Sequence, residues 1–258
     1  MSIPQPPSVA LVAGASSGIG AASARALAAL GTAVALVGRR AAELEKEAAA
    51  IGERGGRAVP LPLDLAAPDG PAEAVVRAEE TLGGPVELLL CSAATIRLAP
   101  VHETDPASWE RQMRLNLTVP YLLAHHVLPG MRARRRGWII TIGSGVGATP
   151  VPGSGAYGVS KCALNRLTEL IHEENRDHGV RTYGISPGWV DTRLAARPES
   201  LGVARDELLR PEDIAETVTW LVQRPAHIAT GPLLRVEPAA GRADAAAAMT
   251  RHLRQGER

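Results

Sequence analysis

Short apolar runs alternate with stretches of helical periodicity along most of the chain. Continuous aliphatic runs of this length are typical of strands that are buried on both faces of a sheet. We predict strands at residues 9–13, 32–37, 57–63, 86–91, 138–142, 180–185 and 233–237. Helices are predicted between them at residues 19–30, 41–51, 71–82 and 105–136, around Tyr157, and at residues 211–222.

Repeated β-α units of this kind predict an α/β fold of the Rossmann type, doubly wound, with helices on both faces of a parallel sheet. No internal repeat or linker divides the 258 residues, so we expect a single domain over residues 1–258. Residues 193–210 mix charges with leucines and predict a substrate lid, the alternative being a surface excursion. Residues 238–258 form an alanine-rich tail with a basic end.

Composition excludes several classes of protein. Hydrophobic residues make up 45% and charged residues 21% of the chain, which is ordinary for a globular domain. The net charge of +1 provides no overall attraction to nucleic acid or to a membrane surface. Cys91 and Cys162 match neither a disulfide framework nor metal-ligand spacing. No signal peptide begins the chain and no apolar run approaches the ~18 residues of a membrane span, so we expect a cytoplasmic protein.

A glycine-rich turn follows the first predicted strand. Its sequence is Gly-Ala-Ser-Ser-Gly-Ile-Gly, residues 14–20, and a helical pattern begins within it. Glycines let the backbone approach a pyrophosphate, and a helix N-terminus offers free N–H groups to it. The order of strand, glycine turn and helix therefore predicts a dinucleotide site.

Two arginines follow the second strand and bear on the choice of cofactor. In nucleotide-binding folds the end of this strand faces the adenosine ribose, where a carboxylate binds a 2′-hydroxyl and an arginine a 2′-phosphate. Gly38 supplies no carboxylate, whereas Arg39, together with Arg40, supplies cations. The alternative is two solvated arginines at a helix start, a poor place for cations. We predict NADP(H) in preference to NAD(H).

Ser144, Tyr157 and Lys161 are the candidate catalytic residues. Tyr157 and Lys161 are four residues apart, which places them on one face of a helix. A lysine cation stabilises a phenolate and lowers the tyrosine pKa, so Tyr157 could serve as a general acid. Ser144 follows a buried strand, where its hydroxyl could hold a substrate oxygen. Taken alone, this trio also fits a solvated helix face and a turn serine.

Pro120 lies within the predicted helix 105–136 and has no N–H group. The carbonyl four residues earlier, that of Asn116, therefore loses its helical partner and could hold a water molecule. The alternative is a kinked helix without a function at this carbonyl.

In order and spacing, these motifs resemble those of the short-chain dehydrogenase/reductase family, from Val9 to about Val236. The resemblance rests on the glycine turn, Asp64, Asn116, Ser144, Tyr157-x3-Lys161, and Pro187-Gly188 through Thr192. It implies a seven-stranded Rossmann-type domain that transfers hydride between a nicotinamide and a carbonyl or alcohol. It also implies that Lys161 binds the nicotinamide ribose, that Asn116 holds a water of a proton relay, and that the protein is a homotetramer or homodimer.

The same resemblance assigns the two halves of a site. The cofactor would contact Gly14, Ser16, Ser17, Gly18, Ile19, Gly20, Arg39, Arg40, Asp64, Leu65, Ser92, Ala93, Tyr157, Lys161, Pro187, Gly188, Val190 and Thr192. By position, the substrate would meet Ala94, Thr95, Val146, Val151, Trp189 and Leu194. The chain departs from the family pattern at Ala13, at residues 91–94 (Cys-Ser-Ala-Ala) and at residues 237–239 (Glu-Pro-Ala), none of which is a catalytic position.

We therefore predict an NADP(H)-dependent reductase of a ketone or aldehyde with a partly apolar pocket. An alcohol-oxidising dehydrogenase would share every motif. A non-catalytic dinucleotide-binding sensor or scaffold is compatible with the altered turns, although the intact Ser-Tyr-Lys set argues against it. A sugar-nucleotide epimerase or dehydratase normally has a different glycine spacing and a longer C-terminal region.

Overall fold

The computed structural model describes residues 5–194, 208–224 and 232–238. Within them, seven parallel strands form one sheet in the order β3-β2-β1-β4-β5-β6-β7. The strands are β1 (Val9–Ala13), β2 (Ala33–Gly38), β3 (Ala58–Pro62), β4 (Leu88–Cys91), β5 (Gly137–Ile142), β6 (Val180–Pro187) and β7 (Leu233–Val236). The predicted fold class and all seven predicted strands are confirmed, with ends that differ by one or two residues.

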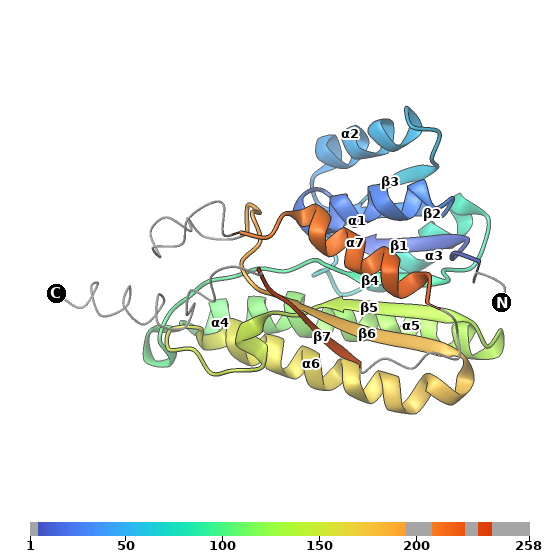
Figure 1. Cartoon of the computed structure of the whole chain (residues 1–258). Coiled ribbons are helices and arrows are strands. Elements are labelled where there is room, and N and C mark those ends of the chain that lie inside the picture. Colours follow the sequence, from blue (N-terminus) through green and yellow to red (C-terminus); the bar gives the residue numbers. More distant parts are fainter. Residues whose placement is uncertain (1–4, 195–207, 225–231, 239–258) are drawn as a thin grey trace.

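Helices cover both faces of the sheet (Figure 1). They are α1 (Gly18–Ala29), α2 (Ala41–Gly52), α3 (Gly70–Leu82), α4 (Pro106–Met113), α5 (Val119–Ala133), α6 (Gly155–Asn175) and α7 (Pro211–Val222). One core layer joins α1, α2 and α7 to the sheet, and the other joins α3, α5 and α6 to it. In β1 the side chains of Ala10 and Val12 enter the first layer, whereas Leu11 and Ala13 enter the second. This alternation is the two-residue period of a strand.

The single helix predicted for residues 105–136 is wrong in one respect. A π-helical turn at Arg114–Thr118 separates α4 from α5, and Val119 donates to the carbonyl of Arg114, five residues earlier. Pro120 follows at once and has no N–H to continue the α-helical pattern toward Asn116. The helical bonding thus changes where the sequence predicts a disturbance, but as a π turn and not as a kink.

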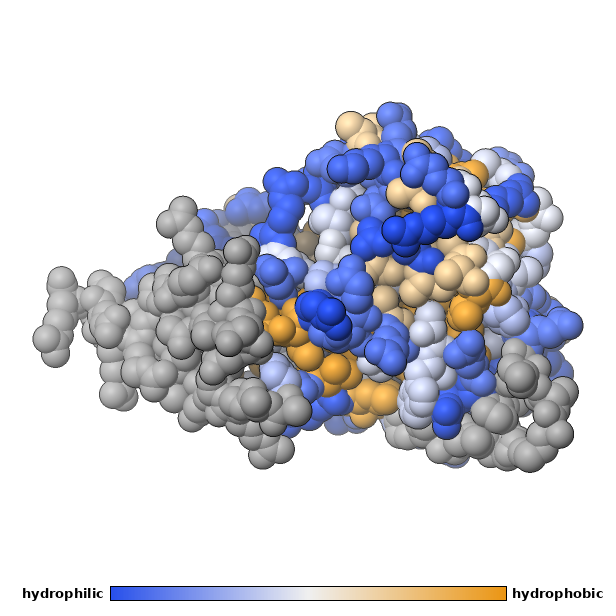
Figure 2. All heavy atoms as spheres, turned by 45° about the horizontal axis from the view of Figure 1, so that its top comes forward, coloured by the Kyte–Doolittle hydropathy of each residue, from blue (hydrophilic) through white to orange (hydrophobic). Residues whose placement is uncertain are grey.

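The outer surface is mainly hydrophilic. On the face shown in Figure 2, hydrophilic residues predominate and apolar residues gather in smaller patches between them. In the part of the chain that the structure describes, no helix has both the length and the apolar character that a membrane crossing requires. The predicted lid lies mostly outside the described residues, as does the C-terminal tail apart from Pro238.

Candidate active site

A cavity of about 870 Å³ lies at the carboxyl ends of the strands. Parallel sheets place ligands at this edge, where the strand order reverses between β1 and β4. Most residues that the sequence predicts for the site line this cavity: Gly14, Ser16, Ser17, Gly18, Ile19, Arg39, Arg40, Asp64, Leu65, Ser92, Ala93, Ala94, Ser144, Val146, Val151, Tyr157, Lys161, Pro187, Gly188, Trp189, Val190, Thr192 and Leu194. Gly20, Thr95 and Asn116 are not among the lining residues.

The glycine turn brings the ends of β1 and β4 into close approach. Gly14 has a φ of +85°, and a Cβ atom there would lie 2.6 Å from the backbone nitrogen of Ala93. A Cβ on Gly20 would collide with the carbonyl of Gly14. The turn therefore requires glycine for both conformation and space. Gly18 and Ile19, the first residues of α1, line the cavity, and the first N–H groups of a helix have no partner within the helix. This cradle fits the pyrophosphate of a dinucleotide.

Arg40 is held directly over this turn. Its guanidinium donates to the hydroxyl of Ser16 at 2.8 Å and to that of Ser17 at 2.7 Å. Arg39 also lines the cavity, but its side chain is exposed. The sequence gives the leading role to Arg39, whereas the geometry places Arg40 closer to the phosphate-binding turn.

The loop after β3 forms the far end of the cavity. Asp64 accepts a hydrogen bond from the backbone N–H of Ala66 at 3.0 Å, and Leu65 is buried. Arg114 donates to the carbonyl of Ala66 at 3.1 Å and to that of Ala67 at 2.9 Å, which fixes the loop from outside. Arg114 was not predicted, because no local pattern links it to a loop so far away in the chain.

Tyr157 and Lys161 lie one turn apart on α6, as predicted, and both are buried. The Lys161 ammonium lies 5.8 Å from the centre of the Tyr157 ring and donates to the carbonyl of Ile142 at 2.7 Å. Burial lowers the pKa of Lys161 to about 8. Burial also raises the pKa of the Cys91 thiol to about 12, so this residue is a neutral neighbour.

Two opposing effects set the pKa of the Tyr157 phenol. Burial raises the Tyr157 pKa, and a hydrogen bond between its side chain and that of Ser144 acts in the opposite direction. In the chain by itself, Tyr157 thus keeps its proton firmly at neutral pH.

Asn116 joins α6 to the segment after β4. Its amide donates to the hydroxyl of Ser160 at 3.0 Å, and that hydroxyl donates to the carbonyl of Tyr157 at 2.8 Å. The same side chain accepts from the N–H of Thr95 at 2.8 Å and donates to the carbonyl of Thr95 at 2.9 Å. The π turn therefore gives Asn116 a positioning contact that the sequence analysis did not anticipate.

Several further residues line the cavity without having been predicted. They include Ile96, Leu98, Leu115, Thr149, Arg193 and Arg235. Ile96 and Leu98 belong to a segment without helical or strand structure, where no periodicity indicates which side chains face the cavity. Among the described residues, no group of three or more His, Cys, Asp or Glu side chains is arranged to hold a metal ion.

Comparisons with known proteins place this geometry in a family. A family model described as short chain dehydrogenase matches residues 8–200. A short chain dehydrogenase of Pseudocercospora fijiensis is 34% identical over 197 residues, covering 76% of this chain and 63% of that protein. The cis-4-hydroxycyclohexanecarboxylate dehydrogenase of Sinomonas cyclohexanicum is 33% identical over 237 residues, covering 89% of this chain and 94% of that protein.

A solved structure gives the same result. A metagenomic short-chain oxidoreductase, solved in complex with NADP, superposes with a TM-score of 0.78 at 34% identity, covering 90% of this chain and 97% of that one. The chain belongs to the short-chain dehydrogenase/reductase family, and it is an oxidoreductase of that family. The predicted family is thereby confirmed.

Proposed function

We propose that this protein is an NADP(H)-dependent reductase that converts a ketone or aldehyde to an alcohol. The observation that carries the proposal is the convergence of Ser144, Tyr157 and Lys161 on one cavity whose other end holds the glycine turn and Arg40. The NADP complex of the related metagenomic structure supports the choice of cofactor.

The site residues have separate tasks in this proposal. The nicotinamide supplies the hydride. Tyr157 donates its proton to the carbonyl oxygen, and its raised pKa keeps the phenol protonated until negative charge develops there. Ser144 orients the carbonyl oxygen. Because Tyr157 is buried, hydrogen bonds to this oxygen are stronger than they would be in water. Lys161 would hold the nicotinamide ribose, and the Asn116 carbonyl would hold a water through which the proton is replaced.

Cofactor preference is tested by calorimetric titration with NADPH, NADP, NADH and NAD. We expect NADPH and NADP to bind more tightly than the unphosphorylated forms. Arg40→Ala should remove most of this preference, because Arg40 follows the end of β2, where a 2′-phosphate would bind, and Ser16 and Ser17 hold its guanidinium in place. Arg39→Ala should reduce the preference less. Each lost charge-assisted hydrogen bond corresponds to roughly tenfold in affinity. Equal binding of NADH and NADPH by the unmutated protein would refute the preference.

Catalysis is tested with Tyr157→Phe, which removes the phenolic hydroxyl and keeps the ring. The variant should lose carbonyl reduction and still bind NADPH with unchanged affinity. A non-catalytic sensor would instead show no turnover before the substitution and unchanged biological activity after it.

Alcohol oxidation is a second candidate, since the Sinomonas relative is named as the dehydrogenase of a cyclic hydroxy acid. Rates with NADPH plus a ketone and with NAD or NADP plus the matching alcohol, measured at pH 7, separate the two directions. A higher kcat/KM with NAD and alcohol would favour oxidation. Light scattering of the same sample measures the predicted dimer or tetramer.

A further inference from the structure

The segment that follows β4 is held in an extended form by two side-chain amides. Asn116 binds both the N–H and the carbonyl of Thr95. Two residues further on, Gln112 accepts from the N–H of Arg97 at 3.1 Å, and its amide nitrogen lies 3.4 Å from the carbonyl of Arg97. Gln112 and Asn116 are four residues apart, so one helical face carries both contacts. Each side-chain amide thus makes the backbone hydrogen bonds that a neighbouring strand would otherwise make.

A third contact continues the pattern at Ala99. Gly155, the first residue of α6, packs so closely on the carbonyl of Ala99 that a Cβ atom at Gly155 would lie 2.5 Å from it. Thr95, Arg97 and Ala99 thus all face the helices α4 to α6. The alternate residues Ile96 and Leu98 line the cavity, as does Ala94.

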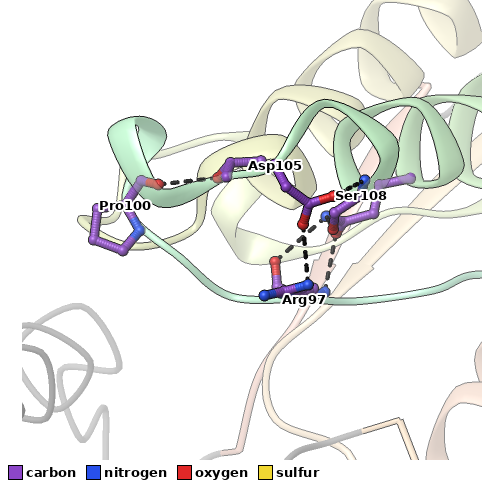
Figure 3. A network of polar contacts seen from close by, with 6 residues as sticks. Arg97, Pro100, Asp105 and Ser108 are labelled. Carbon is purple, nitrogen blue, oxygen red and sulfur yellow. Dashed lines mark hydrogen bonds and ion pairs between the residues drawn. The ribbon is translucent and has the colours of Figure 1, made fainter.

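Arg97 is fixed to α4 by its side chain as well (Figure 3). Its guanidinium forms an ion pair with Asp105 at 3.0 Å, and the other oxygen of Asp105 caps α4 by accepting from Ser108 at 2.8 Å. Gln112 is only 2% exposed, so its amide has little access to water that could replace Arg97 as a partner. Buried amides that are fully hydrogen-bonded specify a single conformation of the groups they bind.

From this arrangement we infer that Ile96 and Leu98 determine substrate specificity and that Gln112 is the residue that positions them. The inference rests on the proposed carbonyl reductase, whose substrate it makes more specific. Val146 and Val151 lie in the loop between β5 and α6 and line the same cavity as Ile96 and Leu98. The space between these aliphatic side chains accepts an apolar chain or ring on the carbonyl carbon. The preferred substrates are therefore ketones with an extended apolar substituent.

Two ketones that differ only in chain length test this inference. The probes are 2-butanone and 2-octanone, measured with saturating NADPH. The unmutated enzyme should have a higher kcat/KM for 2-octanone. Ile96→Ala and Leu98→Ala should each reduce the ratio of the two kcat/KM values about tenfold, chiefly through a higher KM for 2-octanone, because buried methyl and methylene contacts are lost. Unchanged ratios in both variants would overturn the assignment.

Gln112→Met keeps the length of the side chain but removes its two hydrogen bonds with the Arg97 backbone and the one that it donates to the Ser108 hydroxyl at 3.4 Å. It should lower the ratio of kcat/KM for 2-octanone to that for 2-butanone. The KM for 2-octanone should rise by a larger factor than that by which kcat for 2-butanone falls, and NADPH affinity should stay unchanged. Hydrogen exchange should become faster at the Arg97 amide and stay slow at Thr95. Val127→Ala is the matched control, since Val127 is a 3% exposed core residue of α5 and takes no part in these contacts. If it alters the ratio as much as Gln112→Met does, general destabilisation explains the result and the inference is wrong.

A measurement without turnover separates this inference from the proposed function. Calorimetric titration of the protein saturated with NADP should show tighter binding of 2-octanone than of 2-butanone, and Ile96→Ala should remove the difference. If this pattern appears without reduction of any ketone, the role of Ile96 and Leu98 in specificity is supported while the reductase proposal fails. If the two ketones bind alike, that role is refuted whatever the activity.

Discussion

Gly14 is a residue whose backbone leaves no room for a side chain. We predict that Gly14→Ala lowers the free energy of unfolding by about 3 kcal/mol, because the residue has a positive φ and its Cβ would lie 2.6 Å from the Ala93 nitrogen. The variant should also lose NADPH affinity, since the turn must widen. Chemical denaturation and calorimetric titration measure the two effects.

Gly31 provides a matched control for this prediction. Its φ of +89° is almost the same, but a Cβ there would have no atom within 4 Å. Gly31→Ala should therefore cost only about 1 kcal/mol, the conformational part of the effect, and leave cofactor binding intact. Equal losses in the two variants would show that the contact with Ala93 does not matter.

Lys161 is a buried cation whose removal should stabilise the protein while abolishing its activity. The pKa of Lys161 is lowered from 10.5 to about 8. Such a shift corresponds to about 3 kcal/mol, of which the loss of its hydrogen bond cancels about 1 kcal/mol. Lys161→Met should therefore raise Tm at pH 7 by roughly 5 °C, as measured by calorimetry.

The pH dependence gives this prediction its sign. Lys161 is charged in both folded and unfolded chains below its folded pKa of about 8, and there the folded chain bears the full cost of the buried charge. The cost fades as pH rises from 8 toward the unfolded value of 10.5. The Tm advantage of Lys161→Met should shrink accordingly between pH 8 and pH 10. If the difference in Tm between Lys161→Met and the unmutated protein stayed constant or grew over this range, the lowered pKa of Lys161 would be contradicted.

Local spacing made some residues of the site predictable. Tyr157 and Lys161 share a helical face because they are four residues apart, and the glycine turn follows from its place between a strand and a helix. The contacts of Arg40 with Ser16 and Ser17 were not predictable, because they depend on how β1 and β2 align. The balance between burial and Ser144 at Tyr157 likewise depends on the packed structure.

Among the elements, the π turn between α4 and α5 offers the clearest test of how local backbone structure affects catalysis. Pro120→Ala restores an N–H group that could bond to the Asn116 carbonyl and convert the turn to α-helix. We expect little change in stability but a fall in kcat of roughly tenfold to a hundredfold, because Asn116 would shift relative to Thr95 and Ser160. Steady-state kinetics with the reducible ketone measure this effect.

Pro129 lies within α5 and serves as the comparison. Pro129→Ala also restores a helical N–H, but at an exposed position outside the cavity lining. It should raise the free energy of unfolding by about 1–3 kcal/mol and leave kcat unchanged. If both proline variants leave kcat unchanged, the π turn has no catalytic importance.

At this scale the sequence predicts regular elements well and irregular segments poorly. Aliphatic runs located every strand, since buried parallel strands have a simple composition. The path of residues 92–100 depends on Asn116 and Gln112, which lie beyond it in the chain and bind its backbone. Such contacts leave no periodic pattern, so the sequence could not show that Ile96 and Leu98 face the cavity.

For the molecule as a whole, the cavity should link cofactor binding to global stability. It collects residues from both sides of the β1–β4 crossover, so NADPH would contact two halves of the sheet at once. At about 100 times its Kd, NADPH should stabilise the folded chain by about 2.7 kcal/mol and raise Tm by roughly 5–10 °C. Calorimetry should show one transition moving as a unit. Stabilisation confined to one of two separate transitions would contradict the link.

The order of the strands also has a consequence for how the chain folds as it is synthesised. The half-sheet β3-β2-β1-β4 is complete once residue 91 has left the ribosome, and β5, β6 and β7 then add to one edge in the order in which they are made. Until β5 arrives, the aliphatic edge Leu88–Cys91 has no neighbour on that side. During that interval, before α6 has been made, the open edge of β4 is a place where another chain could pair with the nascent sheet.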